Sequence, residues 1–404
     1  MTYGDIAERS RRAAAWCFPV LGFAIPVSTA LDSTVLWLIV LAWLIALPHA
    51  FPEWRKTLAF PPIAVAAALF ALLAIGTFYS DAAPKDAWKI AMKYADLFLM
   101  SVLLWAAAAM RPSNRPLQLF LLAIVLNLIV SYTVSNSIVE RIPGLIHTYP
   151  AYPVGFKLSV THGIFVSFGA FVFLLLAREA RTTATRAPLI GLALLCAHNV
   201  LVIVIGRTGY VLLAILLAYF VLTALRTWKA RGLALVLVAC LFVGAYSVSS
   251  SLQERLGSVL SDLAQWAPGA ADTTSVGQRL EYARTSARII AAHPLGVGTG
   301  GFAAAYKGAA ESSLVTTNPH NDYLMIGVQV GLPGIALLIA LYVLMWRDAS
   351  RLATRLDRDL LRGLVLTMAI AGLFNSVVLD HAEGLLFAWM IALVYARGAA
   401  GRSA

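Results

Sequence analysis

Long apolar runs alternate with short polar segments along most of this 404-residue chain. A predominantly apolar run of about 20 residues is long enough to cross a bilayer as an α-helix. The pattern predicts about twelve spans, at residues 13–31, 33–50, 59–78, 90–109, 117–137, 159–177, 187–205, 208–225, 231–249, 320–346, 359–379 and 383–397. We therefore expect an all-α polytopic membrane protein.

One long polar stretch interrupts this pattern between the ninth and tenth spans. It divides the chain into nine helices at 1–249, a helical loop at 250–319 and three helices at 320–404. Within the loop, an apolar face from Leu252 to Trp266 predicts an amphipathic helix. A second helix is expected from about Val276 to Ala292, with a capping box at Ser275 and Gln278. We expect an ordered cap at the membrane surface.

The composition excludes soluble and disordered classes. The chain is 60% hydrophobic and 13% charged, whereas soluble domains average about 45–50% apolar and about 25% charged residues. A transmembrane β-barrel would alternate apolar and polar positions instead of showing continuous runs.

The net charge of +11 is explained mainly by topology. Most Lys and Arg residues flank one end of the predicted spans, which places both termini in the cytoplasm by the positive-inside rule. The first span also has features of a cleavable signal peptide, but another span follows at once and favours a retained helix. The cations left on the outer side, among them Lys85, Lys89 and Lys93, suggest anionic ligands such as phosphates, with solvated loops or interfacial anchoring as the alternative.

Two arginines are candidates for binding such an anion. Arg207 joins two apolar runs with almost no loop, and an arginine at that depth is expected to face a polar cavity. Arg279 falls in the first turn of the second outer helix, where exposed N–H groups also favour a phosphate. On the same helix, Glu281, Arg284 and Arg288 form a stripe that is most simply self-paired and solvated, although Arg288 is also a candidate supporting residue.

A polar motif opens the tenth span. Asn318 suits the N-cap and Pro319 the first helical position, which places His320 in the first turn. The positive end of a helix dipole would keep the imidazole neutral and able to act as a general base. A histidine that only makes a hydrogen bond is the alternative. Farther along this span, Gly327 and Gly331 predict close packing and Pro333 a kink.

Other motifs are weaker. Asp380 and His381 join the last two spans and form either a polar turn or part of the site. The glycines at 296, 298 and 301 match a dinucleotide-binding pattern, but they follow a helix instead of a strand, so we interpret them as a tight turn or a close approach of a ligand. No spacing typical of a metal or nucleotide site is present, and we expect no metal and no cofactor.

The motifs together resemble those of the O-antigen ligase and O-antigen polymerase superfamily. The similarity rests on Gly206-Arg207-Thr208-Gly209, Gln278-Arg279-Leu280, the Pro294-Leu295-Gly296 turn, Asn318-Pro319-His320-Asn321-Asp322-Tyr323 and Gly331-Leu332-Pro333-Gly334. The number of spans and the long outer loop also match.

The resemblance implies a glycosyltransferase at the periplasmic face of a Gram-negative inner membrane. It would move O-antigen polysaccharide from undecaprenyl diphosphate to lipid A-core oligosaccharide. It also implies an essential histidine at His320 and phosphate-binding arginines at Arg207 and Arg279. Candidate supporting residues are Asn318, Asn321, Asp322, Tyr323, Arg288, Asp380 and His381.

Several alternatives stay open. An O-antigen polymerase or another ligase of lipid-linked glycans would share these motifs. A polysaccharide transporter or flippase is a different class, but it predicts ionisable residues deep in several spans and internal repeats, which are not evident. The glycan, the acceptor hydroxyl and the oligomeric state do not follow from the sequence.

Overall fold

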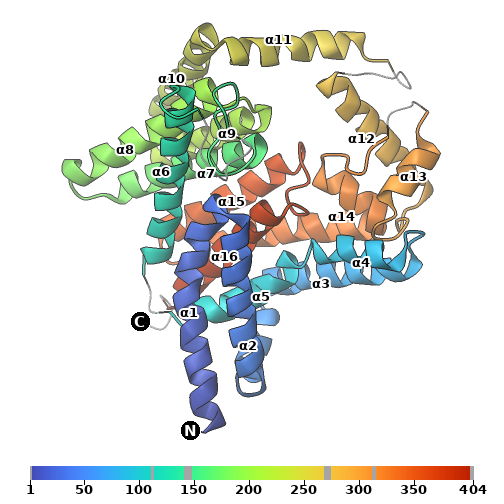
Figure 1. The fold of residues 1–404 in the computed structure, drawn as a ribbon. Helices are drawn as coiled ribbons and strands as arrows, with labels where there is room; N and C mark the ends of the chain where they lie inside the picture. The colour runs from blue at the N-terminus through green and yellow to red at the C-terminus, as the bar shows by residue number, and fades with distance from the viewer. Residues whose placement is uncertain (1, 111–112, 141–147, 268–273, 312–314, 401–404) are drawn as a thin grey trace.

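The computed structural model describes residues 2–110, 113–140, 148–267, 274–311 and 315–400. It is 80% helical, and the described residues contain no β-strand (Figure 1), which confirms the all-α class. The helices are α1 (Tyr3–Val27), α2 (Thr29–Leu58), α3 (Pro61–Gly76), η1 (Thr77–Tyr79), α4 (Pro84–Met92), α5 (Asp96–Ala108), α6 (Arg115–Ser135), α7 (Ser159–Glu179), α8 (Thr183–His198), η2 (Asn199–Ile203), α9 (Arg207–Ala224), α10 (Trp228–Val248), α11 (Ser250–Gln265), α12 (Ser275–Ala292), α13 (Phe302–Ala309), α14 (Asp322–Ala349), α15 (Arg355–Ala371) and α16 (His381–Ala400).

Within the described part of the chain, 9 helical segments are long and apolar enough to cross a membrane. They are α2, α3 with η1, α4 with α5, α6, α7, α8 with η2, α9, α10 and α14. Each overlaps a predicted span, so the chain is a multi-pass membrane protein. The other three predicted spans correspond to α1, α15 and α16, which are helices outside this set, and the total of twelve stays a prediction.

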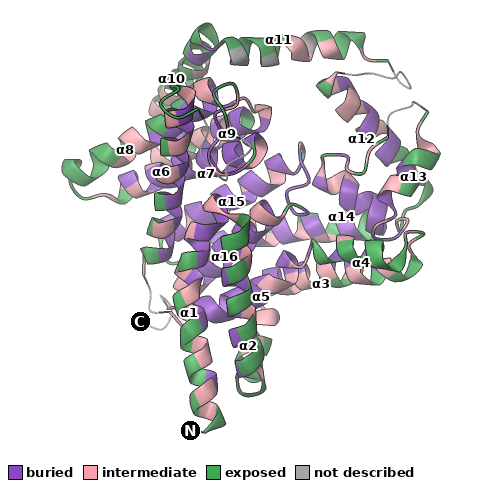
Figure 2. Cartoon of the chain, viewed as in Figure 1, coloured by how far each residue is buried: buried purple, intermediate pink, exposed green. Residues whose placement is uncertain are grey.

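Helix α16 lies at the centre of the bundle (Figure 2). All side chains from Leu385 to Val394 are buried, as expected for a helix that is apolar on every face. Trp389 stacks on Phe18 of α1 with 5.6 Å between ring centroids, and its indole N–H donates to the carbonyl of Phe18 at 2.9 Å. This contact fixes the first helix against the last one.

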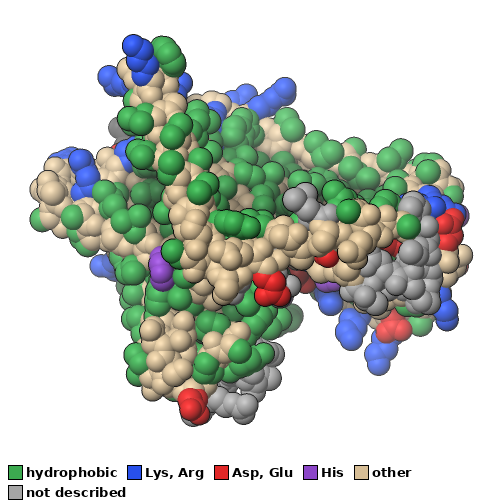
Figure 3. All heavy atoms as spheres, turned by 90° about the horizontal axis from the view of Figure 1, so that it is seen from above, with side chains coloured by type: hydrophobic (Ala, Val, Ile, Leu, Met, Phe, Trp, Pro, Cys, Tyr) green, Lys and Arg blue, Asp and Glu red, His purple; other side chains and the backbone are tan. Residues whose placement is uncertain are grey.

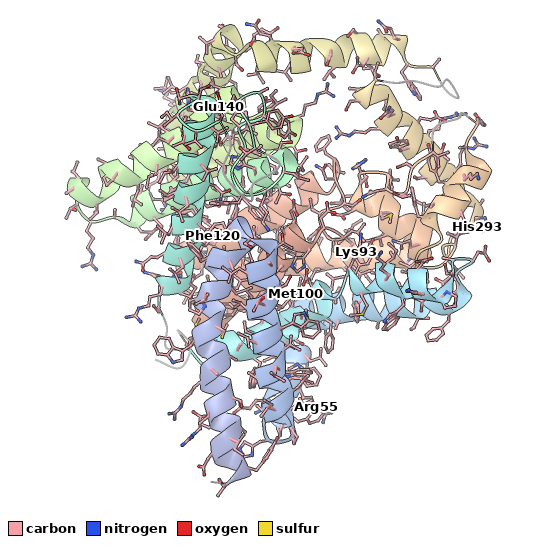
Figure 4. The ribbon with its side chains drawn as sticks, in the orientation of Figure 1. Arg55, Lys93, Met100, Phe120, Glu140 and His293 are labelled. Atoms are coloured by element: carbon pink, nitrogen blue, oxygen red, sulfur yellow. The ribbon has the colours of Figure 1, made fainter. Side chains whose placement is uncertain are left out.

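The outside of the bundle is strongly apolar. Leu233, Val243 and Val248 of α10 are 64%, 65% and 74% exposed. Hydrophobic side chains also cover much of the face in Figure 3, with Lys and Arg gathered toward its edges. In Figure 4, Arg55 from a predicted cytoplasmic segment and His293 from the predicted outer segment lie at well-separated edges of the molecule. Apolar exposure on this scale fits helices that are surrounded by lipid.

The long polar segment 250–319 contains the expected helices. Helix α11 crosses above the bundle from α10 toward α12 (Figure 1). The predicted capping box at Ser275 is wrong by one residue, because the Thr274 hydroxyl accepts the N–H of Gly277 at 3.1 Å. Two adjacent hydroxyl residues offered the same capping chemistry. Residues 268–273 and 312–314 of this predicted segment lie outside the described residues.

The predicted kink in α14 is confirmed. Three residues before Pro333 the helix is broken by Val330 (φ −130°, ψ 17°) and Gly331 (φ 69°, ψ −161°). Gly327, which we expected at a close contact, packs on α12: a Cβ there would lie 2.7 Å from Cδ1 of Ile290.

The glycine-rich turn after α12 fills the break in α14. The N–H groups of Val297 and Gly298 donate to the carbonyls of Val328 and Gln329, both at 2.9 Å. Gly298 has φ +89°, and a Cβ there would lie 2.4 Å from the Cα of Ser80. The tight-turn interpretation is therefore confirmed: backbone, and not a ligand, makes the close approach to this glycine.

We predict that Gly331→Ala destabilises the protein by at least about 2 kcal/mol, because a left-handed non-glycine residue is strained and the new Cβ would meet backbone. That Cβ would lie 2.1 Å from the carbonyl oxygen of Pro294. Thermal unfolding in detergent measures the effect. The control is Gly244→Ala in α10, where a Cβ meets nothing within 4 Å. Equal unfolding temperatures for the two variants would contradict the prediction.

Candidate active site

Arg207 is the first residue of α9. The α8 helix ends in the π-helical turn η2, and the chain then turns at Gly206, the N-cap of α9. Gly209 packs so closely on α7 that a Cβ there would lie 3.2 Å from the Cα of Gly163. The Arg207 Nη2 donates to Ser258 Oγ of α11 at 2.9 Å. The side chain thus reaches from the start of α9 to helix α11, which crosses above the bundle (Figure 1).

Arg279 comes from α12 and lies within electrostatic range of Arg207. It is the fifth residue of α12, just past the first turn in which we had expected it. Burial lowers the pKa of Arg279, and the positive charge of Arg207 lowers it further. Two guanidinium groups that repel each other in a partly buried place are best stabilised by an anion between them.

His320 completes this group. It is exposed, and it lies close enough to Arg279 for the two side chains to interact electrostatically. The loss of solvent around its ring lowers the pKa of His320, and the charge of Arg279 lowers it further. The structure therefore places Arg279 within electrostatic range of both Arg207 and His320, although these three residues lie far apart along the chain.

The predicted start of the tenth span is wrong. The N-cap is Asn321, whose Oδ1 accepts the N–H of Leu324 at 3.0 Å, and not Asn318. Pro319 and His320 precede the helix, and His320 has φ 53° in the left-handed region. The Asn318 side chain does not cap the helix. Its Oδ1 instead accepts the backbone N–H of His320 at 2.8 Å. The helix dipole therefore does not explain the lowered pKa of His320; the loss of solvent around its ring and the charge of Arg279 do.

The other residues of this motif hold it against the chain between α15 and α16. Asn321 Nδ2 donates to the Leu373 carbonyl at 3.0 Å. The buried Asp322 accepts the N–H of Val378 at 3.1 Å. Tyr323 donates its hydroxyl to the Ala369 carbonyl of α15 at 3.0 Å. These three residues hold the chain that directly follows His320 against residues 369–378.

Arg288 lies in a separate ion-pair cluster. Its guanidinium pairs with Glu311, which also binds Arg284 at 2.9 Å. Arg284 pairs with Glu281 at 3.5 Å as well. Pairing within the stripe is confirmed only for Arg284 with Glu281, because Arg288 pairs with Glu311 outside it, and Glu281 is buried instead of solvated.

Asp380 and His381 face a second polar cluster. His381 Nε2 lies 2.9 Å from Oδ1 of the buried Asp32, and Asp32 also pairs with Lys157 at 3.5 Å. Lys93, toward the middle of the molecule in Figure 4, opposes the rise in the pKa of Asp380 that burial causes. No motif in the sequence indicates that Asp32 takes part, because its partners come from distant segments.

Among the residues that the structure describes, no group of three or more His, Cys, Asp or Glu side chains is arranged to hold a metal ion. Independence of metals and cofactors stays a prediction.

Fold and site together define a class: a multi-pass helical membrane protein in which Arg279 of a polar helical segment lies within electrostatic range of Arg207 and His320. Residues 191–339 match the family model described as O-antigen ligase, so this part of the chain is similar to that family, as the motifs indicated. The match includes Arg207, Arg279 and His320. The family implies a ligase- or polymerase-type enzyme that acts on lipid-linked glycans. No curated protein matches the chain significantly.

Proposed function

We propose that this protein transfers O-antigen polysaccharide from undecaprenyl diphosphate to lipid A-core oligosaccharide, at the periplasmic face of a Gram-negative inner membrane. The observation that carries the proposal is the electrostatic proximity of Arg207, Arg279 and His320 within the matched region. The positive-inside pattern supports twelve spans with both termini in the cytoplasm.

The arginines would bind the diphosphate of the donor. As the bond between the sugar C1 and the diphosphate oxygen breaks, the electron pair stays on that oxygen and negative charge develops there. Guanidinium groups fixed in advance stabilise such charge without reorganising, and their planar forks suit phosphate oxygens. A diphosphate is already a good leaving group, so the reaction needs no general acid.

His320 would activate the acceptor. Its neutral imidazole takes the proton of the acceptor hydroxyl while that oxygen attacks C1. The products are the new glycosidic bond, undecaprenyl diphosphate and a protonated histidine, which then loses its proton to solvent. Direct attack from the side opposite the leaving group inverts the configuration at C1.

The proposal is tested by genetic complementation. The chain is expressed with its own core acceptor and O-antigen pathway in a strain that lacks only the ligase, and the lipopolysaccharide is separated on a gel. A restored ladder on lipid A-core supports the ligase. No ladder from protein that is present in the membrane would contradict it and favour the polymerase, which the same test in a polymerase-null strain would detect.

We predict that transfer persists at mildly acidic pH. The base works only when neutral, and the pKa of His320 lies below its ordinary value of 6.5, so the rate should fall only when the pH drops through that lowered pKa. Arg279→Gln removes one cause of the lowering and should move the acidic limb of the kcat/KM profile to higher pH. Arg284→Gln is the control on the same helix. An acidic limb at or above pH 6.5 in the unmodified protein would contradict this prediction.

We also predict that EDTA leaves the transfer rate unchanged, because guanidinium groups take the role that a divalent cation has in many diphosphate-using enzymes. The rate is measured with purified protein before and after dialysis against EDTA. A loss that Mg²⁺ or Mn²⁺ restores would contradict the metal-independent mechanism.

A further inference from the structure

The segment between α15 and α16, residues 372–380, contacts both halves of the candidate active site. It follows the last residue of α15, Ala371, and leads into the central helix α16. Most of this connection is buried: Asn375 is 5% exposed and Ser376 is 1% exposed. It lies outside the region that matches the family model. Buried polar side chains in a connection need partners, and theirs lie in the site.

Asn375 binds the segment that carries Arg207. Its Nδ2 donates to Oγ1 of the buried Thr208 at 2.9 Å. Thr208 is the second residue of α9 and follows Arg207 directly. The hydrogen bond therefore fixes the first turn of α9, from which the Arg207 side chain starts.

Ser376, the next residue, binds the segment that carries His320. Its Oγ donates to Oδ1 of Asn318 at 2.7 Å, and the same oxygen accepts the backbone N–H of His320 at 2.8 Å. His320 has φ 53°, a conformation that costs an ordinary residue about 1–2 kcal/mol and needs support from its surroundings. The shared acceptor on Asn318 supplies that support.

The rest of the connection fixes the same motif. The N–H of Asp322 donates to the carbonyl of Gly372 at 2.8 Å, and the N–H of Val378 donates back to the Asp322 carboxylate at 3.1 Å. The His320 motif is thus held on both sides of Ser376.

We propose that Asn375 and Ser376 are positioning residues, which set the distance and orientation between the donor-binding Arg207 and the base His320. The inference rests on the proposed function of those two residues. The reaction needs the acceptor oxygen, C1 and the leaving oxygen in line, so base and diphosphate site must be held in one geometry. A misplacement of about 1 Å can cost about 100-fold in rate.

The two residues act on different steps, and steady-state kinetics separates them. The full-length protein in detergent is assayed with undecaprenyl-diphosphate-linked glycan as donor and lipid A-core as acceptor. Asn375→Ala acts through Arg207 and should raise the KM for the donor about 10-fold. Ser376→Ala acts through His320 and should lower kcat about 10- to 100-fold while the donor KM changes less than about twofold.

Pairs of substitutions at the partner residues distinguish a loss of positioning from a loss of folding. Thr208→Val removes only the hydroxyl that Asn375 binds and should reproduce the KM effect, whereas Thr208→Ser keeps the hydroxyl and should not. Asn318→Asp keeps an oxygen that accepts both hydrogen bonds, so it should retain more activity than Asn318→Ala. A loop that only stabilised the fold would lower the active fraction alike in all these variants and leave the donor KM unchanged. That outcome would overturn the inference.

Failure of the inference is distinguishable from failure of the proposed function. If His320→Ala and Arg207→Ala lose activity while Asn375→Ala and Ser376→Ala have unmodified kinetics, only the positioning role is wrong. If His320→Ala retains normal activity, the proposed base is wrong and the inference falls with it.

Discussion

Replacement of His320 is expected to abolish glycan transfer while leaving folded protein in the membrane. A positioned general base contributes about 10²- to 10⁴-fold, and the charge of Arg279, one of the two proposed diphosphate-binding arginines, acts on the His320 side chain. His320→Ala is the simplest variant. His320→Asn is the sharper one, because asparagine tolerates the left-handed conformation that this position has.

The loss is measured as the rate of transfer from the lipid-linked donor to lipid A-core at saturating substrate. His293→Ala is the matched control, since His293 is an exposed histidine of the outer segment at the opposite end of α12 from the site. Near-normal transfer by both His320 variants would remove this residue as the base. Unfolded or missing protein would be detected by comparison of thermal unfolding with the control.

Hydropathy predicted most of the fold because few backbone conformations are stable inside a bilayer. A chain in lipid must satisfy its backbone hydrogen bonds internally, and a helix does so with local residues alone. The spans from Thr29 to Val248 and the α14 span are therefore visible in the sequence. The heavily basic start of α1 and the short α15 weaken the same signal at the two ends of the chain.

The convergence of the site residues was predicted by motif resemblance, but its geometry was not. Asn318 and Asn321 are both good N-caps by local chemistry, and local chemistry alone does not decide between them. Which asparagine caps the helix depends on Ser376, 58 residues from Asn318, because the Ser376 hydroxyl donates a hydrogen bond to the Asn318 side-chain oxygen. A contact of this kind leaves no periodicity in the sequence.

The connection between α15 and α16, residues 372–380, shows the same limit. It carries no catalytic motif, and hydropathy wrongly placed residues 372–379 inside the predicted span 359–379, whereas α15 ends at Ala371. Its importance comes from a hydrogen bond between Asn375 and Thr208, which are 167 residues apart. Likewise, the glycine turn was recognised as tight, but its partner, the broken backbone of α14, is apparent only in three dimensions.

The second large effect is expected at the arginines. Arg207→Ala and Arg279→Ala should each lower transfer about 10²- to 10³-fold, the usual cost of removing one preorganised group that stabilises developing charge. Lysine at either position should restore only part of the activity, because an ammonium lacks the planar fork that binds two phosphate oxygens. Since both arginines are proposed to hold one diphosphate, the double variant should lose less than the product of the two single losses.

These losses should appear in the use of the donor and not of the acceptor, so initial rates are measured over a range of lipid-linked donor at fixed lipid A-core. Arg284→Gln is the control, because this arginine lies on the same helix as Arg279 but is paired with Glu281 and Glu311. Its kinetics should match those of the unmodified protein. Unchanged donor kinetics in Arg207→Ala and Arg279→Ala would refute the diphosphate assignment even if His320 proved essential. An effect confined to the acceptor would instead move these arginines to the phosphates of the lipid A-core.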